Sequence, residues 1–445
     1  MAGLYHRVMY DFSQPVPSWW ETGRQSHAKP QARPLTSDET CEVAVIGGGY
    51  CGLSAAYHLA RRGADVRVLE AGEIGWGASG RNGGFCSIGA SFLGPTEIAS
   101  NYGIQEALKF YAALVASVRL VEALAAEEGI ELERQGDGVW TFAHNEKRLG
   151  DLQAQARILV QTGVAAEVID RAAFRERAFD CTEQAGALHE AVGFGLNPLS
   201  YCLGLAVAAE KRGAVLHSRS CVTRRSKDGD VHVLETSQGS VRARKIIVAA
   251  NGWLPEHLFP ELAGRVLPIM SNITVTQPLS ENVLQAQGWH TENPASNTRN
   301  HLSYLRLLPG RRFLFGGRGD TTGAPDGLVE MRKLLERRRS LLFPAFATQP
   351  TSHSWRGLIA ATRRLTPAVG TLPSDPTVGY AFGCHGNGVA FMTWAGRALA
   401  QMLSGADADL PAAIAGLPQR FPLPALRLWA LRGMLLVKHA EDEWF

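Results

Sequence analysis

The segment from Cys41 to Glu70 has the pattern of a strand, a glycine-rich turn, a helix and a second strand. Apolar residues mark both expected strands, at 43, 45 and 46 in the first and at 66, 68 and 69 in the second. The turn carries the spacing GxGxxG at Gly47, Gly49 and Gly52. In such a unit the first glycine permits a tight turn, the second lets the backbone approach a pyrophosphate, and the third lets the helix pack on the strand. The segment therefore predicts a dinucleotide site, with the phosphates at the helix N-terminus and the ribose hydroxyls at Glu70.

The composition is that of an ordinary globular protein. The chain has 445 residues, of which 45% are hydrophobic and 20% charged, so a large core and two domains are expected. A formal net charge of +3 gives no reason to expect nucleic acid as a partner. We find no apolar run long enough to span a bilayer, and we expect no secretory signal in the first twenty residues.

The seven cysteines are spread along the chain without a C-x-x-C pair. Their odd number favours reduced thiols in a cytoplasm over a disulfide framework, and their spacing predicts no metal site. Several stand in apolar runs, where packing in a core is the simplest interpretation.

Patterns along the chain indicate a dinucleotide domain that is interrupted by other sequence. A polar N-terminal arm, 1–39, contains Trp19 and Trp20 as its expected anchors. Strand and helix signals return at 198–252 and at 378–403. The expected ranges are 40–100, 190–260 and 351–420 for the dinucleotide domain, 101–189 and 261–350 for a substrate domain, and 421–445 for a C-terminal segment.

The expected substrate domain contains helix signals and two hairpin signals. Apolar residues between Ile104 and Val118 recur with helical spacing. Residues 130–142 are expected to form a hairpin that turns at the glycine-rich positions 136–138. A second hairpin is expected to join 304–308 to 312–316.

Three further motifs carry a family resemblance. They are GASGRNGG at 77–84, AANG at 249–252 and GCHGNG at 383–388. Together with the segment 45–70 they resemble the D-amino-acid oxidase superfamily of FAD-dependent amine oxidases. Glycine oxidases, sarcosine oxidases and gamma-glutamylputrescine oxidases belong to it, and the loop at 77–84 is most similar to that of the last group. The resemblance covers nearly the whole chain after residue 40 and does not specify a substrate.

The resemblance implies an α/β fold. It consists of a discontinuous, Rossmann-like FAD-binding domain of the glutathione-reductase type, with an inserted α+β substrate domain built on an antiparallel sheet. The glycine-rich loop would wrap the FAD pyrophosphate, and the helix that follows 386–388 would point its positive end at the flavin. The loop has no histidine, and Cys384 lies in a glycine turn rather than in an attachment motif, so FAD is expected to be noncovalent.

The resemblance also assigns the cofactor contacts residue by residue. The expected FAD-binding residues are Gly47, Gly49, Tyr50, Cys51, Gly52, Glu70, Ala71, Gly77, Ala78, Ser79, Arg81, Asn82, Gly83, Gly84, Val222, Ala250, Asn251, Gly252, Trp355, Gly357, Gly386, Asn387, Gly388 and Val389. In many family members an aspartate follows the proline of the segment after Trp355; Ala368 stands there in this chain, which puts that contact in doubt.

The residues expected to act on the substrate are Tyr304, Arg306 and His385. Strand alternation puts Tyr304 and Arg306 on one face. Several family members bind a substrate carboxylate through an arginine on a comparable strand, which suits the bidentate geometry of a guanidinium. An arginine exposed at a sheet edge is the alternative. His385 is expected to shape the pocket or to neighbour the flavin.

The implied reaction oxidises a C–N bond by hydride transfer to flavin N5. Hydrolysis of the imine and reoxidation by O2 would follow, and H2O2 would be released. Expected substrates are amino acids, N-substituted glycines or gamma-glutamyl polyamines. A dehydrogenase that uses a quinone or a carrier protein, and a non-catalytic flavin-binding subunit, are the alternatives. The apolar run 426–437 either packs on the body or lies on a partner or membrane surface.

Overall fold

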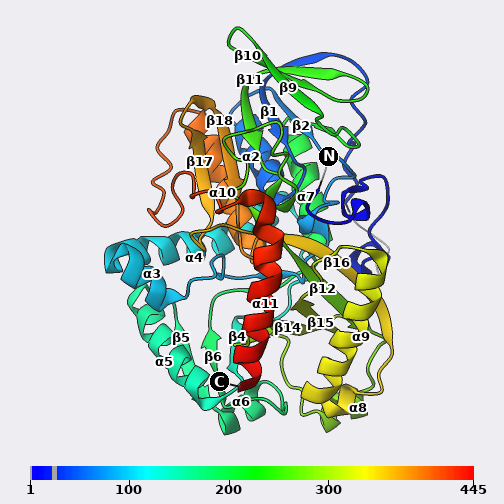
Figure 1. Ribbon diagram of the computed structural model, residues 1–445, viewed down its shortest axis with the longest axis vertical. Helices are drawn as coiled ribbons and strands as arrows, with labels where there is room; N and C mark the ends of the chain where they lie inside the picture. The colour runs from blue at the N-terminus through cyan, green and yellow to red at the C-terminus, as the bar shows by residue number, and fades with distance from the viewer. Residues whose placement is uncertain (1–2, 23–27, 445) are drawn as a thin grey trace.

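The computed structural model describes residues 3–22 and 28–444. Two eight-stranded sheets organise the chain, and Figure 1 shows the first in the upper part of the molecule and the second in the lower part. The α/β architecture predicted from the family resemblance is confirmed. Among the described residues no helix is long and apolar enough to cross a membrane.

The first sheet has the strand order β17-β18-β11-β1-β2-β8. Strands from β18 to β8 are parallel, and β17 is an antiparallel edge. β9 and β10 extend β11 as an antiparallel ribbon. The bounds are β1 Glu39–Ile46, β2 Val66–Leu69, β8 Val215–His217, β9 Arg224–Asp228, β10 Val231–Glu235, β11 Ser240–Val248, β17 Ala368–Leu372 and β18 Asp375–Phe382. The parallel strands are apolar because helices or loops cover both of their faces.

Helices α2, α7 and α10 share one core with this sheet. They span Tyr50–Ala60, Pro198–Lys211 and Val389–Leu403. Glycine sets the distance between two of them. A Cβ atom added at Gly396 of α10 would lie 2.3 Å from the backbone oxygen of Cys51 in α2, so no larger residue fits this crossing. The close contact fixes the N-terminus of α2 relative to the sheet.

The second sheet has the order β16-β12-β15-β14-β13-β4-β6-β5. All its pairings are antiparallel except that of β13 with β4. The bounds are β4 Val139–Ala143, β5 Ala166–Asp170, β6 Gly186–Glu190, β12 Leu267–Thr276, β13 Ala295–Asn297, β14 Ser303–Leu308, β15 Arg312–Arg318 and β16 Thr351–Ala361. One face packs on an aromatic core around Phe179, Trp289, Phe313 and Phe343.

The remaining helices lie around these two sheets (Figure 1). They are α1 Trp19–Thr22, α3 Pro95–Tyr102, α4 Ile104–Glu128, α5 Glu146–Gln161, α6 Arg171–Arg177, α8 Glu281–Ala286, α9 Pro325–Leu342 and α11 Arg427–Trp444. Short 3-10 helices span Arg7–Tyr10, Ala78–Gly80, Asn251–Trp253, Pro344–Phe346 and Pro424–Leu426. A two-stranded ribbon joins β3 Phe85–Cys86 to β7 Phe194–Gly195.

One sequence expectation differs from this fold, and another is met with a shifted buried face. The hairpin expected at 130–142 is wrong, because β4 is its only strand and pairs with β6 and β13, more distant along the chain. The two glycines of the expected turn do have positive φ, but they lead into β4 from an irregular segment. The helix signal at 104–118 is met by α4, although Ile104 is 40% exposed and Phe110 and Leu114 form the buried face.

The expected domain ranges divide the second sheet at residue 351. β16 pairs with β12 from Leu267 to Thr276, so its residues belong with the second sheet. α4 shares the core of the first sheet with α10, although its residues fall in the expected substrate range. We therefore propose that the boundary lies after Ala361 and that α4 belongs with the first domain.

Candidate functional site

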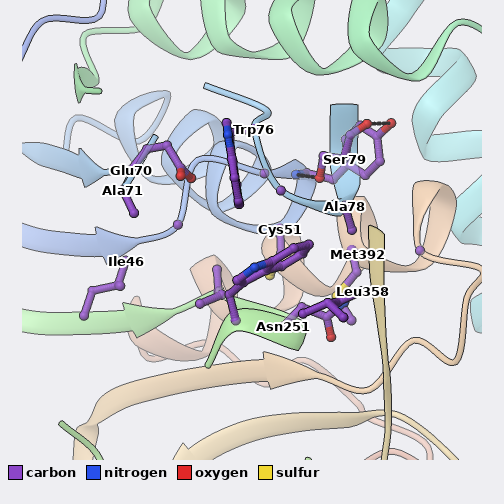
Figure 2. A pocket seen from close by; sticks show the side chains of 18 of the residues that line it. Ile46, Cys51, Glu70, Ala71, Trp76, Ala78, Ser79, Asn251, Leu358 and Met392 are labelled. Atoms are coloured by element: carbon purple, nitrogen blue, oxygen red, sulfur yellow. Dashed lines mark hydrogen bonds between the residues drawn. The ribbon is translucent and has the colours of Figure 1, made fainter. Parts of the chain in front are cut away.

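A cavity lies beyond the carboxyl ends of β1, β2 and β11, where ligands bind in open parallel sheets. Ile46, Leu69 and Ala249, which end or follow these strands, line it. Figure 2 shows Glu70 and Ser79 at opposite ends of this cavity with Trp76 between them. We call it the dinucleotide cavity.

The N-terminus of α2 and the glycine-rich loop form one end of the dinucleotide cavity. The backbone N–H of Tyr50 donates to Ser79 Oγ at 3.0 Å, and the Tyr50 hydroxyl donates to the Ser79 carbonyl at 2.8 Å. Asn82 Nδ2 donates to the carbonyls of Ala78 and Ser79 at 3.1 Å. These bonds hold the loop over a helix N-terminus, which carries a partial positive charge and suits an anion such as a pyrophosphate.

Glu70 lies at the other end. Its carboxylate accepts backbone N–H groups from Gly48 at 2.7 Å and from Gly72 at 3.0 Å. Burial raises the pKa of the Glu70 carboxyl, and the same two bonds oppose this rise. Two fixed bonds leave further lone pairs on the carboxylate that can accept from ribose hydroxyls.

An aromatic cover that sequence reasoning missed closes the dinucleotide cavity. Phe12, Trp76 and Trp253 line it. Their rings meet edge to face, with centroids 4.9 Å apart for Phe12–Trp76 and 5.7 Å apart for Trp76–Trp253. The indole N–H groups of Trp76 and Trp253 donate to the carbonyls of Gln14 and Met9. The N-terminal arm is therefore part of the cavity wall. The available sequence signal was Trp76, which directly precedes the glycine-rich loop.

Trp20 anchors the arm, as the sequence suggested. Its side chain is only 1% exposed, and its Nε1 donates to the Asn82 carbonyl at 2.8 Å. Trp19 packs more openly, against His353 and Arg312. The arm thus contacts the glycine-rich loop through a buried hydrogen bond.

A second cavity adjoins the first, and we call it the substrate chamber. The two share six lining residues, namely Ala78, Asn82, Leu358, Ile359, Gly386 and Val389. The second sheet contributes Thr141, Ser271, Ile273, Ser296 and Tyr304 to the chamber. The segment 87–95, Tyr111 of α4 and Gln155 of α5 also line it. A ligand group at the shared residues can therefore contact molecules in both spaces.

Arg318 brings a cationic side chain into the substrate chamber. It ends β15, beside Ser271 of β12, and its guanidinium lies 4.4 Å from the ring centroid of Phe92. Among the residues that the structure describes, no acidic side chain pairs with it within 4.0 Å. Burial lowers the pKa of Arg318 to about 10, so the group stays cationic at neutral pH. Such a charge is suited to an anionic ligand group.

Tyr304 also faces the chamber. Its hydroxyl lies 2.7 Å from Ser271 Oγ and shares a hydrogen bond with it. Burial raises the pKa of Tyr304 to about 12, so the phenol is neutral and can donate.

Arg306 lies on the same strand but does not line the chamber. Its Nη2 donates to the Leu196 carbonyl at 2.7 Å, and its guanidinium lies 5.6 Å from the Trp20 ring centroid. Cβ atoms added at Gly84 and Gly195 would touch it, so both glycines make room for this buried arginine. The sequence pointed to Arg306 as the carboxylate-binding group; its position favours a structural role beneath the glycine-rich loop.

His385 lines the chamber in a strained turn with φ of +52°. Its backbone N–H donates to the Ala360 carbonyl, and its Nε2 accepts the backbone N–H of Thr362 at 3.2 Å. Burial lowers the pKa of His385 to about 3, so its ring is neutral at physiological pH. A neutral ring held in this way is a fixed part of the wall.

The structure brings most of the expected cofactor residues together around the dinucleotide cavity. Those lining it are Gly47, Gly49, Tyr50, Cys51, Glu70, Ala71, Gly77, Ala78, Ser79, Asn82, Val222, Ala250, Asn251, Gly386, Gly388 and Val389. Arg81, Gly83, Gly357 and Asn387 line the substrate chamber instead. Residues that the sequence did not single out include Phe12, Trp253, Leu358, Ile359 and Met392.

The other expected residues support these walls from behind. Gly52 packs on the Gly47 turn, and Gly84 and Gly252 lie against Arg306 and Leu358. Trp355 Nε1 donates to the Arg81 carbonyl at 2.8 Å. Asn251 is held between its Nδ2 donation to Cys384 Sγ and its Oδ1, which accepts the backbone N–H of Gly383.

Comparison with known proteins decides the family. A family model described as FAD dependent oxidoreductase matches residues 42–402. The chain belongs to this DAO family of FAD-dependent oxidoreductases. It is 33% identical to gamma-glutamylputrescine oxidoreductase of Escherichia coli, over 88% of this chain and 90% of that protein. It is 22% identical to glycine oxidase of Bacillus subtilis, over 81% and 92%.

A solved structure shares the fold of this FAD-dependent oxidoreductase. Glycine oxidase from Geobacillus kaustophilus covers 86% of this chain and 100% of its own, with a TM-score of 0.70 and 21% identity. At 21% identity, this similarity supports a shared fold and no shared activity. Membership of the family makes the chain an enzyme and FAD its cofactor.

The dinucleotide cavity fits FAD on its own chemistry. It joins an anion-binding helix end to a carboxylate that can accept from hydroxyl groups, and it opens into the chamber through six shared residues. We propose that the loop at 77–84 and α2 hold the pyrophosphate, that Glu70 holds the ribose, and that the flavin lies at the shared residues. When bound there, FAD supplies the chamber with a two-electron acceptor.

We expect acid precipitation to release the flavin and to leave a colourless pellet. Cys51 and Cys384 are buried thiols that line the dinucleotide cavity. Burial raises the pKa of both, to about 12 for Cys51. A protonated thiol is a poor nucleophile, so neither is suited to form a bond with FAD. The absorbance of the supernatant and pellet measures the outcome, and a pellet that stays yellow would contradict noncovalent binding.

Proposed function

We propose that the protein oxidises the C–N bond of an amino acid or secondary amine and uses O2 as the electron acceptor. The carbon beside the nitrogen loses a hydride and the nitrogen loses a proton, which gives an imine, while O2 takes up the two electrons and two protons and becomes H2O2. Water then adds to the imine and releases a carbonyl compound and an amine. FAD held in the dinucleotide cavity would supply the two-electron chemistry that links the two half-reactions.

The observation that carries this proposal is the chamber itself. A half-buried arginine, with no acidic partner among the described residues, faces a space that shares its wall with the dinucleotide cavity. A substrate carboxylate would neutralise Arg318 and accept two parallel hydrogen bonds from it. The same contact would fix the carbon to be oxidised relative to the shared residues, and such positioning is a major part of catalysis.

Neighbouring residues have supporting roles in this proposal. Tyr304, held by Ser271, can donate its hydroxyl hydrogen to the same carboxylate. His385 is neutral and already hydrogen-bonded, so we give it a role in shaping the chamber rather than that of a base. A substrate amine can lose its proton to solvent before it binds, and no protein base is then required.

The relatives narrow the substrate class. One is named for gamma-glutamylputrescine and another for glycine, and both names describe compounds that join an amine to a carboxylate. Amino acids, N-substituted glycines and gamma-glutamyl polyamines are therefore our candidates. We keep the cytoplasm as the proposed location, on the basis of the odd number of cysteines.

A dehydrogenase is the second candidate. The C-terminal segment exposes Leu423 (71%), Trp429 (66%) and Val437 (59%), and an apolar surface of this kind could meet an electron carrier or a quinone-containing membrane. The two candidates share the chemistry at the substrate and differ in the electron acceptor.

An anaerobic screen of amines and amino acids tests the proposal. We expect at least one compound with both an amine and a carboxylate to bleach the flavin absorbance of the holoenzyme within seconds to minutes. Admitting air should then restore the colour and release about one H2O2 for each substrate oxidised. Restored colour only with an artificial dye or a quinone would favour the dehydrogenase, and failure of every amine to bleach the flavin would refute amine oxidation.

A further inference from the structure

Glu190 places a carboxylate on the wall of the substrate chamber. It ends β6, where it pairs with Val139 of β4 and Ala166 of β5. Its side chain is half-buried and faces the chamber together with Tyr111, Thr141 and Gln155. Among the described residues, no hydrogen-bond donor or cation pairs with its carboxylate.

An unpaired carboxylate in such a position is unfavourable. Burial raises the pKa of Glu190 to about 7, and no neighbouring charge is close enough to oppose the rise. A nearby cation would stabilise the ionised form and would offset its desolvation. The neighbours do not provide one, since Tyr111, Thr141 and Gln155 are all uncharged groups. A cation that stabilises the ionised form would therefore come from a molecule in the chamber.

The chamber consequently carries opposite charges on two separate strands. Arg318 lies on β15 and Glu190 on β6, and β14, β13 and β4 stand between these two strands. Four steps of about 4.8 Å separate the two backbones across the sheet, or roughly 19 Å. The two side chains form no ion pair within 4.0 Å. β15 is two positions from β16, which carries the shared residues Leu358 and Ile359, whereas β6 is six positions from β16.

We propose that Glu190 binds a second, distal ammonium group of the substrate. The proposal rests on the function proposed above and extends it to a substrate class. The substrate would carry a carboxylate at Arg318, the reacting amine at the shared residues, and a cationic amine at the end of a spacer. Apolar Ile88, Leu93 and Val139 also line the chamber, and they suit a hydrocarbon spacer.

Two small molecules test this on the holoenzyme. N-(4-aminobutyl)glycine carries the distal ammonium, and N-pentylglycine replaces it with a methyl group of similar size. We expect isothermal titration calorimetry at pH 8.5 to give the ammonium compound an affinity about 10- to 100-fold higher, as for other hydrogen bonds between charged groups. Glu190→Gln should remove this preference and leave the affinity for N-pentylglycine and the flavin spectrum unchanged.

A matched substitution controls for general effects of charge. Glu167→Gln changes a carboxylate on the neighbouring strand β5 whose side chain is 51% exposed and pairs with Arg177 outside the chamber. This variant should keep the wild-type preference. Glu190→Asp, which retains the charge, should keep part of it and covers the case in which the glutamine variant folds poorly.

The outcomes separate this inference from the proposed function. Equal affinities of the two compounds in the wild type, an unchanged preference in Glu190→Gln, or no binding of either compound would overturn the role of Glu190. Calorimetry on the holoenzyme with its flavin reduced beforehand, under anaerobic conditions, excludes turnover, so each of these results stands whether or not the compounds bleach the oxidised flavin. Bleaching by N-pentylglycine without a preference for the ammonium would retain the amine oxidoreductase and reject the distal cation site.

Discussion

Replacing Arg318 with glutamine is expected to raise the KM for a carboxylate substrate about 100-fold or more, while FAD stays bound. The guanidinium has no acidic partner among the described residues, so the substrate carboxylate would be its counter-ion. Hydrogen bonds between charged groups contribute about 1.5–3 kcal/mol each, and bidentate pairs contribute two. Glutamine keeps a polar side chain, but it is shorter and carries neither the charge nor the second donor group.

Steady-state kinetics with the best substrate of the amine screen would measure the effect. The carboxamide of the same substrate should lose little affinity on going from wild type to Arg318→Gln, because it has no charge to pair. Arg312→Gln is the matched control, since Arg312 lies on the same strand six residues earlier and outside the chamber. A KM within threefold of the wild type in Arg318→Gln would rule out this role.

Arg306→Gln distinguishes Arg306, to which the sequence pointed, from Arg318, which the structure adds. Arg306 is 1% exposed and donates to the Leu196 carbonyl beneath the glycine-rich loop. We expect its replacement to lower the melting temperature, because buried polar atoms lose their partner, and to leave the KM nearly unchanged. A large rise in KM with unchanged stability would indicate that Arg306, rather than Arg318, binds the substrate carboxylate.

The choice between these arginines shows where sequence reasoning stops. Alternation along β14 correctly groups Tyr304 with Arg306, but it cannot say what covers each part of that face. The arm and the ribbon of β3 and β7 cover Arg306, whereas the chamber opens above Tyr304 and Arg318. The covering segments lie more than a hundred residues away in sequence, so no local pattern reveals them.

The glycine-rich turn after β1 is more accessible to prediction, because the residues that define it are close together in the sequence. The strand, turn, helix and Glu70 lie within thirty residues, and each position has one physical requirement. The aromatic cover is different, since Phe12, Trp76 and Trp253 come from three separated segments that meet only in the fold. The sequence also did not reveal that β4 pairs with β6 rather than with the residues before it, because β6 is distant along the chain.

Alanine at Gly52 is expected to abolish FAD binding. A Cβ atom added there would lie 1.9 Å from the Gly47 carbonyl oxygen and 3.0 Å from Val45 Cγ1. Rotation of a side chain cannot relieve this clash, because the Gly47 oxygen belongs to the backbone. Helix α2 therefore has to move away from the turn. α10 prevents most of that movement, because Gly396 already touches the backbone of Cys51. The hydrogen bond from Tyr50 N–H to Ser79 Oγ then has to lengthen, and the pyrophosphate end of the cavity is distorted.

Overpacking of this kind costs about 1–3 kcal/mol or more, and loss of the aligned N–H groups adds to it. We therefore expect the Gly52→Ala protein to purify without the flavin absorbance, to melt at a lower temperature, and to bind added FAD at least 100-fold more weakly in a fluorescence titration. Gly150→Ala is the control, since Gly150 is exposed within α5 and an added Cβ meets nothing within 4 Å. That variant should gain up to about 1 kcal/mol in stability and remain yellow. A yellow Gly52→Ala protein with wild-type affinity for FAD would mean that the dinucleotide binds elsewhere.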